Sequence, residues 1–367
     1  MPFDVAYLRS IRYELSDSGS VATPHKLRRA IANHFILLRK GEAQRLSAPD
    51  SPLFQLLEGW RPGSLASVKT DVFREQVEYS EQIKAELAAI SRMGGRDRPG
   101  RERALREMAD LCARLGPFEG LEAGVLVDIL LTYRTLEYWD GMIAFVGALP
   151  EYLQGRVLVQ EQLALALNRR AESGNLDDRD RALQILKGIE SEHGQNAETS
   201  GLIGRVHKDQ WSSWRTVDPG VAAVHLDDAI LAYRRGFTAD PTDPYPGINL
   251  LTLLEVRGDA EAKEELGRML PVVEFAARRL LDREDVRYWV SATLLELAVL
   301  RRDEPTAVGC AARIRARSRN RWEAKTTLRN IELIVDAREG RLEDAGWIRQ
   351  LLSGLGYQEG PDAGGYG

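Results

Sequence analysis

The chain has 367 residues, of which 44% are hydrophobic and 29% are charged, and its formal net charge is -5. This length and composition suit a soluble globular protein with a large core, and the acidic balance argues against nucleic acid as a partner. The only cysteines, Cys112 and Cys310, argue against a disulfide framework or a cysteine zinc site and predict a cytoplasmic location. Neither a transmembrane run of about 18 apolar residues nor a signal-peptide core occurs, so no membrane partner is expected.

Residues 1–60 differ in character from the rest of the chain and predict a small α or α/β segment. Residues 5–15 alternate weakly and carry aromatic and β-branched side chains, which allows a short strand. Residues 25–40 indicate an amphipathic helix, with Leu27, Ile31, Phe35 and Leu38 on one face. A connecting helix is predicted over 61–93, and the glycine-rich, charged stretch 94–104 is predicted to be a linker.

Residues 105–355 predict a succession of helices that pair as hairpins. Helical runs rich in Leu, Ala, Arg and Glu are separated by turn and capping signals such as "SGNLDD", "EHGQN", "DPTDPYPG" and "RGDA". The expected fold class is therefore mainly α, with about six hairpins wound into a right-handed superhelix. Residues 356–367 are expected to form a disordered tail.

A degenerate tetratricopeptide pattern supports the superhelix. That repeat takes small residues at positions 8 and 20, a large ring at 24 and proline at 32. With Ala229 at position 20, Tyr233 falls at 24 and Pro241 at 32; with Ala182 at position 20, Gly204 falls at position 8 of the next unit. The two alanines are 47 residues apart (229 minus 182) instead of 34, so "WSSWRTVDPGVAA" is predicted to be an insertion fastened to the stack by its tryptophans.

Six short motifs stand in one order along the chain: "ALNRR" (166–170), "RALQIL" (181–186), "GRVHKD" (204–209), "AYRRGFTADP" (232–241), "GINLLTLL" (247–254) and "YW" (288–289). In this order they resemble the central TRAF-binding, tetratricopeptide-like region of the apoptosis-signal-regulating MAP kinase kinase kinases and its bacterial relatives. The resemblance covers roughly residues 105–340 and implies a helical regulatory region. His207 stands where the family usually has Tyr. No glycine-rich loop, HRD or DFG motif occurs, so kinase activity is not implied.

The N-terminal residues extend this resemblance. "PFDVAYLRSIRYEL" (2–15) is similar to the last strand-bearing segment after a Rossmann-like domain in the bacterial relatives, and "VKTDVFREQVEYS" (68–80) is similar to a recurring motif there. The resemblance implies that the chain begins where a sensor or nucleotide-processing domain would end. An alternative function is therefore part of a nucleotide-processing enzyme whose catalytic Rossmann-like domain is absent from this chain.

The motif "GRVHKD" supplies the main candidate site. Arg205, Lys208 and Asp209 recur at positions i, i+3 and i+4, which places them on one helical face. In a concave groove, Arg205 and Lys208 suit an anion such as a phosphate or an acidic peptide. The alternative is a salt bridge through Asp209 that fixes the packing of neighbouring repeats.

Four residues from other motifs join this candidate ligand- or partner-binding set. Asn168 follows the apolar run "LALAL" and Asn249 lies within "GINLLTLL", so both amides should be semi-buried and must be satisfied. Each could clamp a peptide backbone or a base edge, or could cap a neighbouring helix. Arg134 would add a further cation to the groove, and Arg169 directly follows Asn168.

A second candidate set lies near the start of the predicted connecting helix. Lys69, Asp71, Arg74 and Tyr79 belong to a dense polar stretch that could contact a neighbouring domain or a nucleotide bound by it. A solvated helix face is the alternative explanation.

Other chemistries find less support. The arginine run at 311–321 would suit RNA, but it belongs to an acidic chain and lies at a predicted helix C-terminus, where the dipole favours cations. The five histidines lack HxxxH or HExxH spacing, so no metal site is predicted, and no catalytic residue or cofactor is expected. The sequence thus predicts a non-catalytic binding and regulatory module of a signalling or stress-defence system. It would recognise a protein partner or a nucleotide-like ligand, and homo-oligomer formation is left open.

Overall fold

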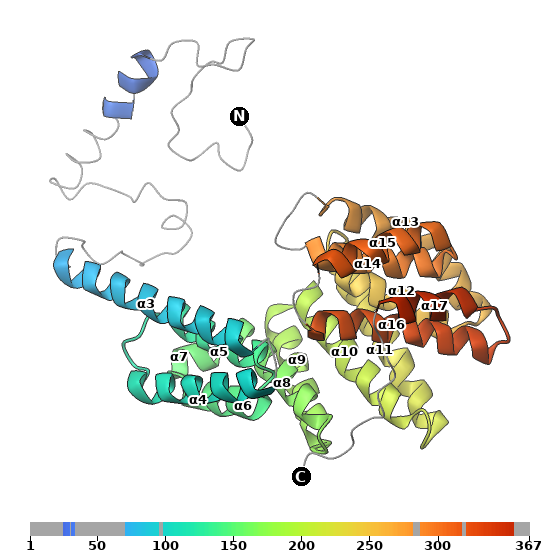
Figure 1. Cartoon of the computed structure of the whole chain (residues 1–367), viewed down its shortest axis with the longest axis horizontal. Coiled ribbons are helices and arrows are strands. Elements are labelled where there is room, and N and C mark those ends of the chain that lie inside the picture. The colour runs from blue at the N-terminus through green and yellow to red at the C-terminus, as the bar shows by residue number, and fades with distance from the viewer. Residues whose placement is uncertain are drawn as a thin grey trace. The chain divides into compact units, whose positions relative to one another are not determined.

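The computed structural model describes residues 25–29, 31–33, 70–94, 98–281, 287–317 and 321–355, and within them every regular element is a helix (Figure 1). The helices are α3 (Thr70–Gly94), α4 (Arg98–Leu115), α5 (Ala123–Thr135), α6 (Trp139–Ala148), α7 (Glu151–Gln154), α8 (Val157–Ala171), α9 (Asp177–His193), α10 (Ala197–Trp214), α11 (Pro219–Ala239), α12 (Pro244–Arg257), α13 (Ala260–Arg278), α14 (Arg287–Leu300), α15 (Glu304–Arg317), α16 (Arg321–Gly340) and α17 (Gly346–Gly354). The chain separates into two units, Met1–Glu78 and Tyr79–Gly367. Among the described residues, the buried core belongs to the second unit.

The predicted N-terminal segment is described only in part. Residues 25–29 and 31–33 are helical, within the amphipathic helix expected at 25–40. The strand expected at 5–15 and the tail at 356–367 lie outside the described residues. Residues 98–104, the last part of the predicted linker, form the start of α4, where Ala104 is fully buried. The domain boundaries stay a prediction.

The second unit is built of helices that pack as successive hairpins. Neighbouring helices contact each other from α8 to α15, and the pair α10–α11 is the most extensive. The even-numbered helices from α6 to α16 also contact the next even-numbered helix, so they form a continuous row on which the odd-numbered helices pack. This arrangement confirms the mainly α fold of helical hairpins. The tetratricopeptide assignment and the handedness of the winding stay predictions.

Capping residues fix where these helices begin. The side chains of Asn196, Asp218, Asp243 and Asp259 accept hydrogen bonds from backbone N–H groups in the first turns of α10, α11, α12 and α13. Each such bond satisfies a helix-end donor that has no partner inside the helix. Gly258 ends α12 in the left-handed conformation at φ 69°. Asn196, Asp243, Gly258 and Asp259 belong to the turn signals "EHGQN", "DPTDPYPG" and "RGDA", which therefore mark these boundaries correctly, whereas Asp218 lies in the segment predicted to be an insertion.

The α10–α11 hairpin brings small residues against a large ring. A Cβ on Gly204 would lie 2.8 Å from the ring of Tyr233, which is fully buried. The predicted insertion does not form a long loop, because α10 continues to Trp214 and α11 already begins at Pro219. Trp211 is buried in the core of this hairpin, but Trp214 is 39% exposed, so only the first of the two tryptophans fastens the extension.

The apolar core is divided into clusters that are formed mainly by successive helices of the chain. One cluster joins residues from Ile83 to Val206 with Ala232, and a second joins residues from Phe237 to Leu352. A smaller cluster around Trp211 and Tyr233 belongs to α10–α13. The division fits stacked hairpins, in which each element packs mainly on its neighbours. Among the described residues, no helix is both long and apolar enough to cross a membrane.

Candidate functional site

Helix α10 carries the predicted charged face of "GRVHKD". Its small residues Gly201 and Gly204 let neighbouring rings approach the helix closely. Arg205 and Lys208 are buried, and the side chain of Asp209 is 12% exposed. All three side chains line one cavity, as the i, i+3, i+4 spacing predicts.

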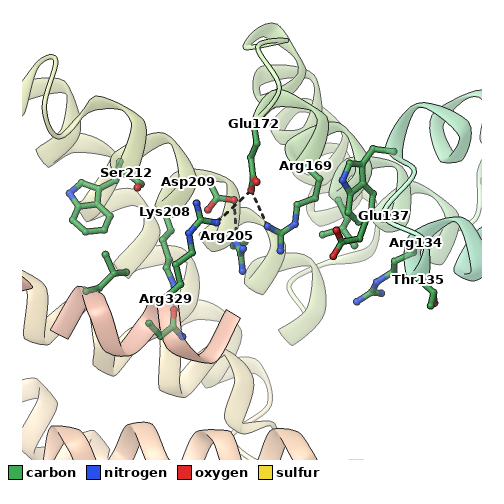
Figure 2. A pocket seen from close by; sticks show the side chains of 15 residues that line it. Arg134, Thr135, Glu137, Arg169, Glu172, Arg205, Lys208, Asp209, Ser212 and Arg329 are labelled. Carbon is green, nitrogen blue, oxygen red and sulfur yellow. Dashed lines mark hydrogen bonds and ion pairs between the residues drawn. The ribbon is translucent and has the colours of Figure 1, made fainter. Parts of the chain in front are cut away.

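The cavity has a volume of about 220 Å³ and is formed by α5, α8, α10 and α16 together with the start of α6 (Figure 2). The lining residues come from segments that lie far apart in the sequence, from Arg134 of α5 to Leu333 of α16. Its charged lining residues are Arg134, Glu137, Arg169, Glu172, Arg205, Lys208, Asp209 and Arg329, and its other lining residues are Thr135, Trp139, Leu165, Trp211, Ser212, Asn330 and Leu333. We call it the cationic cavity, because five of the charged residues are basic and three are acidic.

The acidic residues leave part of this positive charge uncompensated. Glu172 accepts a hydrogen bond from Arg169 Nη1 at 3.0 Å and lies 3.9 Å from Arg329 Nη1. Arg134 donates to the neutral side chain of Gln162 at 3.1 Å and forms no salt bridge among the described residues, although Glu198 lies near enough to feel its charge. Burial and the nearby Arg205 lower the pKa of Arg169, which is the effect of crowding cations away from water. An anion in the cavity would relieve that crowding.

Asp209 is the counter-charge within the cluster. Its Oδ2 accepts from Arg205 Nε at 3.1 Å and from Asn168 Nδ2 at 2.7 Å, so α10 is tied to α8. Burial acts to raise the pKa of Asp209, but Arg205 and Arg169 outweigh it and hold the pKa at about 2. Burial likewise opposes the charge on Arg205, and Asp209 overcomes this and raises the pKa of the guanidinium. The pair is therefore ionised at neutral pH.

Lys208 extends the network toward the C-terminal helices. Its Nζ donates to Asn249 Oδ1 at 3.0 Å and to Asn330 Oδ1 at 2.5 Å, and Asn330 Nδ2 donates to Glu296 Oε2 at 3.0 Å. Burial, reinforced by Arg205, lowers the pKa of Lys208 to about 7. Burial raises the pKa of Glu296 to about 7. This chain of side chains joins α10, α12, α16 and α14 through polar groups that have little access to water.

The structure brings most of the first predicted set together. Arg134, Arg169, Arg205, Lys208 and Asp209 all line the cationic cavity. Asn168 and Asn249 lie behind the lining, where Asn168 holds Asp209 and Asn249 holds Lys208. Asn249 also donates to the carbonyl of Tyr245 in its own helix at 3.0 Å.

No sequence pattern pointed to several other lining residues, among them Glu137, Trp139, Glu172 and Arg329. Arg329 comes from α16, more than 100 residues after α10, and no short-range pattern links the two helices.

The second predicted set is described in part. Lys69 and the side chains of Asp71 and Arg74 lie outside the described residues, and Tyr79 is 48% exposed on α3. The arginine run is also only partly described. Arg313 and Arg315 are exposed on α15, where Arg315 donates to the carbonyl of Gly354 at 3.0 Å.

Comparison with known proteins decides the family. A family model described as the MAP3K TRAFs-binding domain matches residues 13–350. The chain belongs to the MAP3K TRAFs-binding domain family. The matched region of this TRAFs-binding domain contains every residue of the cationic cavity. The match confirms the family resemblance drawn from the six motifs and begins much earlier, at residue 13, while the kinship with bacterial relatives stays a prediction.

Several protein kinases contain a region similar to this TRAFs-binding domain. Mitogen-activated protein kinase kinase kinase nsy-1 of Caenorhabditis elegans is 31% identical over 221 residues, which are 56% of this chain and 14% of that protein. Mitogen-activated protein kinase kinase kinase 15 of Mus musculus is 28% identical over 237 residues, which are 62% and 17%. Mitogen-activated protein kinase kinase kinase 5 of Homo sapiens is 26% identical over 232 residues, which are 61% and 16%. This chain thus spans less than a fifth of the length of each of these relatives.

Proposed function

We propose that this chain is a non-catalytic binding module of a signalling system and that its cationic cavity receives an acidic side chain of a protein partner. The observation that carries the proposal is the excess of basic groups around the cavity, where Arg134 forms no salt bridge among the described residues. Guanidinium groups bind carboxylates and phosphates through paired hydrogen bonds, which gives such a site both charge and directional selectivity. The family name points to TRAF proteins as the kind of partner.

The size of the cavity favours a side chain over a whole nucleotide. Sites that enclose drug-sized ligands usually have volumes of about 300–1,000 Å³, and this cavity has about 220 Å³. A glutamate or phosphoserine side chain would fit within that volume while the rest of the partner stays outside. Trp139 and Trp211 in the lining supply apolar surface beside the charges, as at many protein interfaces.

The alternative, a nucleotide-processing enzyme completed by a Rossmann-like domain, depends on Lys69, Asp71 and Arg74, whose side chains lie outside the described residues. It stays a prediction. A free nucleotide therefore enters the experiment as a competing ligand.

The test compares a fluorescent, glutamate-rich decapeptide, the same peptide with one phosphoserine, and ATP, by anisotropy at two salt concentrations. We expect one of the acidic peptides to bind more tightly than ATP, with an affinity that falls as salt rises. Arg134→Gln and Arg329→Gln should each weaken peptide binding by about tenfold, since each removes a charged donor at the edge of the cavity.

Arg181→Gln is the matched control, because Arg181 is exposed on α9 and does not line the cavity. Its affinity should equal that of the parent chain. If ATP binds more tightly than either peptide and loses affinity in the same two variants, the cavity is a nucleotide site instead. If no ligand responds to Arg134→Gln and Arg329→Gln, the cavity is not a binding site for anions and the proposal is wrong.

A further inference from the structure

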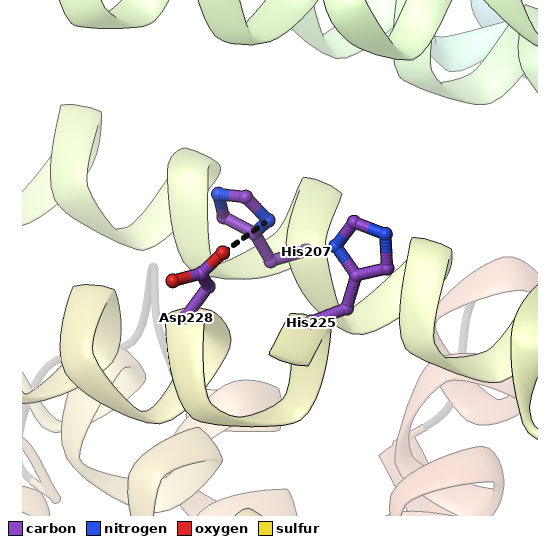
Figure 3. A group of neighbouring side chains, drawn as sticks. All are labelled: His207, His225 and Asp228. Carbon is purple, nitrogen blue, oxygen red and sulfur yellow. Dashed lines mark ion pairs between the residues drawn. The ribbon is translucent and has the colours of Figure 1, made fainter. Parts of the chain in front are cut away.

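Three metal-ligating side chains converge between α10 and α11, outside the lining of the cationic cavity. His207 comes from α10, and His225 and Asp228 come from α11. One potential ligand atom of each residue lies within 4.8 Å of the corresponding atoms of the other two. Figure 3 shows a nitrogen of His207 placed between the carboxylate of Asp228 and a nitrogen of the His225 ring.

The packing of the hairpin creates this arrangement. The close approach of Gly204 to Tyr233 holds the two helices together, and His207 lies one turn after Gly204. His225 and Asp228 are spaced i, i+3, so both lie on the same face of α11. Their ligand atoms therefore meet the side chain of His207 across the interface.

Each of the two histidines has one ring nitrogen that is closed to solvent and unpaired. His207 is only 7% exposed, and neither its Nδ1 nor the buried Nδ1 of His225 has a hydrogen-bond partner among the described residues. Buried polar atoms in folded proteins are nearly always paired, so two neighbouring unpaired nitrogens require an explanation. A shared ligand that accepts electron pairs would satisfy both.

The geometry leaves a lone pair of His207 available for such a ligand. The Nδ1 of His207 lies 3.8 Å from Oδ2 of Asp228, which is too far for a hydrogen bond between them. A neutral imidazole nitrogen is the form of histidine that binds metals.

We propose that His207, His225 and Asp228 form a zinc-binding site that links α10 to α11. Two imidazole nitrogens and one carboxylate oxygen make a ligand set that zinc commonly takes, and water supplies the fourth position. Bonds of about 2.0–2.1 Å imply ligand atoms about 3.3 Å apart in a tetrahedron. The widest present spacing is up to 4.8 Å, so shifts of up to about 1.5 Å would close it, and rotamer changes of the partly exposed His225 and Asp228 can supply them. The nearby positive charge of Lys187 would repel a zinc ion. We therefore expect a zinc affinity below that of a site with two carboxylates.

The test is a zinc titration of the chelator-treated full chain, followed by calorimetry and by thermal unfolding. We expect one zinc ion per chain and a rise in the unfolding temperature of about 5 °C at saturation. Cobalt in place of zinc should give the visible absorption of a four-coordinate ion. His225→Ala and Asp228→Asn should each weaken zinc binding by at least tenfold, and both positions are partly exposed, so the fold should tolerate them.

His193→Ala is the matched control, because His193 ends α9 with a side chain that is 52% exposed and takes no part in the cluster. It should bind zinc as the parent chain does. Absence of zinc binding by the parent chain would overturn the proposal. Binding that persists unchanged in His225→Ala and Asp228→Asn would overturn it as well, by placing the ion elsewhere. The outcome is independent of the peptide experiment, because none of these three residues lines the cationic cavity.

Discussion

Asp209 shows how a single buried carboxylate maintains the cationic cavity. It is the acceptor for both Arg205 and Asn168, and its pKa of about 2 is the result of a competition that the neighbouring arginines win against burial. Removing one partner of a buried ion pair leaves the other charge without compensation, which usually costs about 3–5 kcal/mol.

Asp209→Asn should lower the free energy of unfolding by about 3 kcal/mol at pH 7, because Arg205 and Arg169 lose their counter-charge. The carboxyl has a lower pKa in the folded chain than the 3.8 of an ordinary aspartate. Its contribution is therefore fully present above about pH 4 and is lost as the pH falls through 2, by about 2 kcal/mol. Urea unfolding of both proteins from pH 7 to pH 2 measures this, and parallel acid profiles would contradict it.

Glu296→Gln should change the pH dependence of stability near neutrality. Burial raises the pKa of Glu296 from 4.5 to about 7, so the folded chain binds the extra proton and its stability falls as the pH rises from 4.5 through 7. Burial lowers the pKa of Lys208 from 10.5 to about 7, so this residue makes the folded chain more stable as the pH rises from 7 to 10.5. The glutamine of the variant still accepts a hydrogen bond from Asn330 but cannot titrate. The decrease in stability between pH 4.5 and pH 7 should therefore disappear.

Denaturant unfolding at several pH values checks this profile. Glu192→Gln serves as the control, because the side chain of Glu192 is 78% exposed. It should keep the parent profile. If the free energy of unfolding of Glu296→Gln still decreases between pH 4.5 and pH 7, another group is responsible for the decrease.

At the scale of the helix, two glycines that look alike in sequence have different environments. Gly204 of α10 lies against the buried ring of Tyr233, and an added Cβ would come within 2.8 Å of it. Gly188 of α9 is exposed, and an added Cβ would meet no atom within 4 Å. The intrinsic preference for alanine in a helix, about 1 kcal/mol, is the same at both sites, so packing alone decides the difference.

Gly188→Ala should therefore raise the free energy of unfolding by about 1 kcal/mol. Gly204→Ala should lower it by about 1–3 kcal/mol, because the overpacking of the α10–α11 interface outweighs the helix preference. Chemical denaturation of the two variants beside the parent chain checks the pair. Equal effects of the same sign would show that Gly204 is not held at a tight contact.

These elements also show what the sequence could predict. Capping residues, prolines and glycines act within a few residues, so the turn signals locate the starts of α10, α12 and α13. The i, i+3, i+4 spacing of Arg205, Lys208 and Asp209 likewise predicts one shared face. Arg329 and the histidine–aspartate cluster escaped prediction, because their partners come from other helices and only packing sets those distances. The insertion was misjudged because extra residues can lengthen two helices as readily as they form a loop.

On the scale of the whole molecule, buried arginines join helices that apolar contacts alone would leave less firmly connected. Arg338 of α16 is 1% exposed and donates to Glu255 of α12 at 2.8 Å and to the carbonyls of Val299 and Leu300 in α14, each at 3.1 Å. An apolar side chain at position 338 could not donate any of these three hydrogen bonds. The three helices belong to the C-terminal part of the row, where the second apolar cluster lies.

Arg338→Met should lower the free energy of unfolding by about 3 kcal/mol, because two carbonyls lose a buried donor and Glu255 keeps only Arg341, at 2.9 Å, as its charged partner. Arg278→Gln is the control, since the side chain of Arg278 is 57% exposed in its pair with Glu274 and such pairs contribute less than about 1 kcal/mol. Stacked helices depend mostly on their neighbours, so the loss should stay local. Amide hydrogen exchange should accelerate in α12–α16 more than in α5–α8, whose core belongs to the first apolar cluster. Equal acceleration in both regions would mean that the row of helices unfolds as one cooperative body, and Arg338 would then stabilise the molecule as a whole.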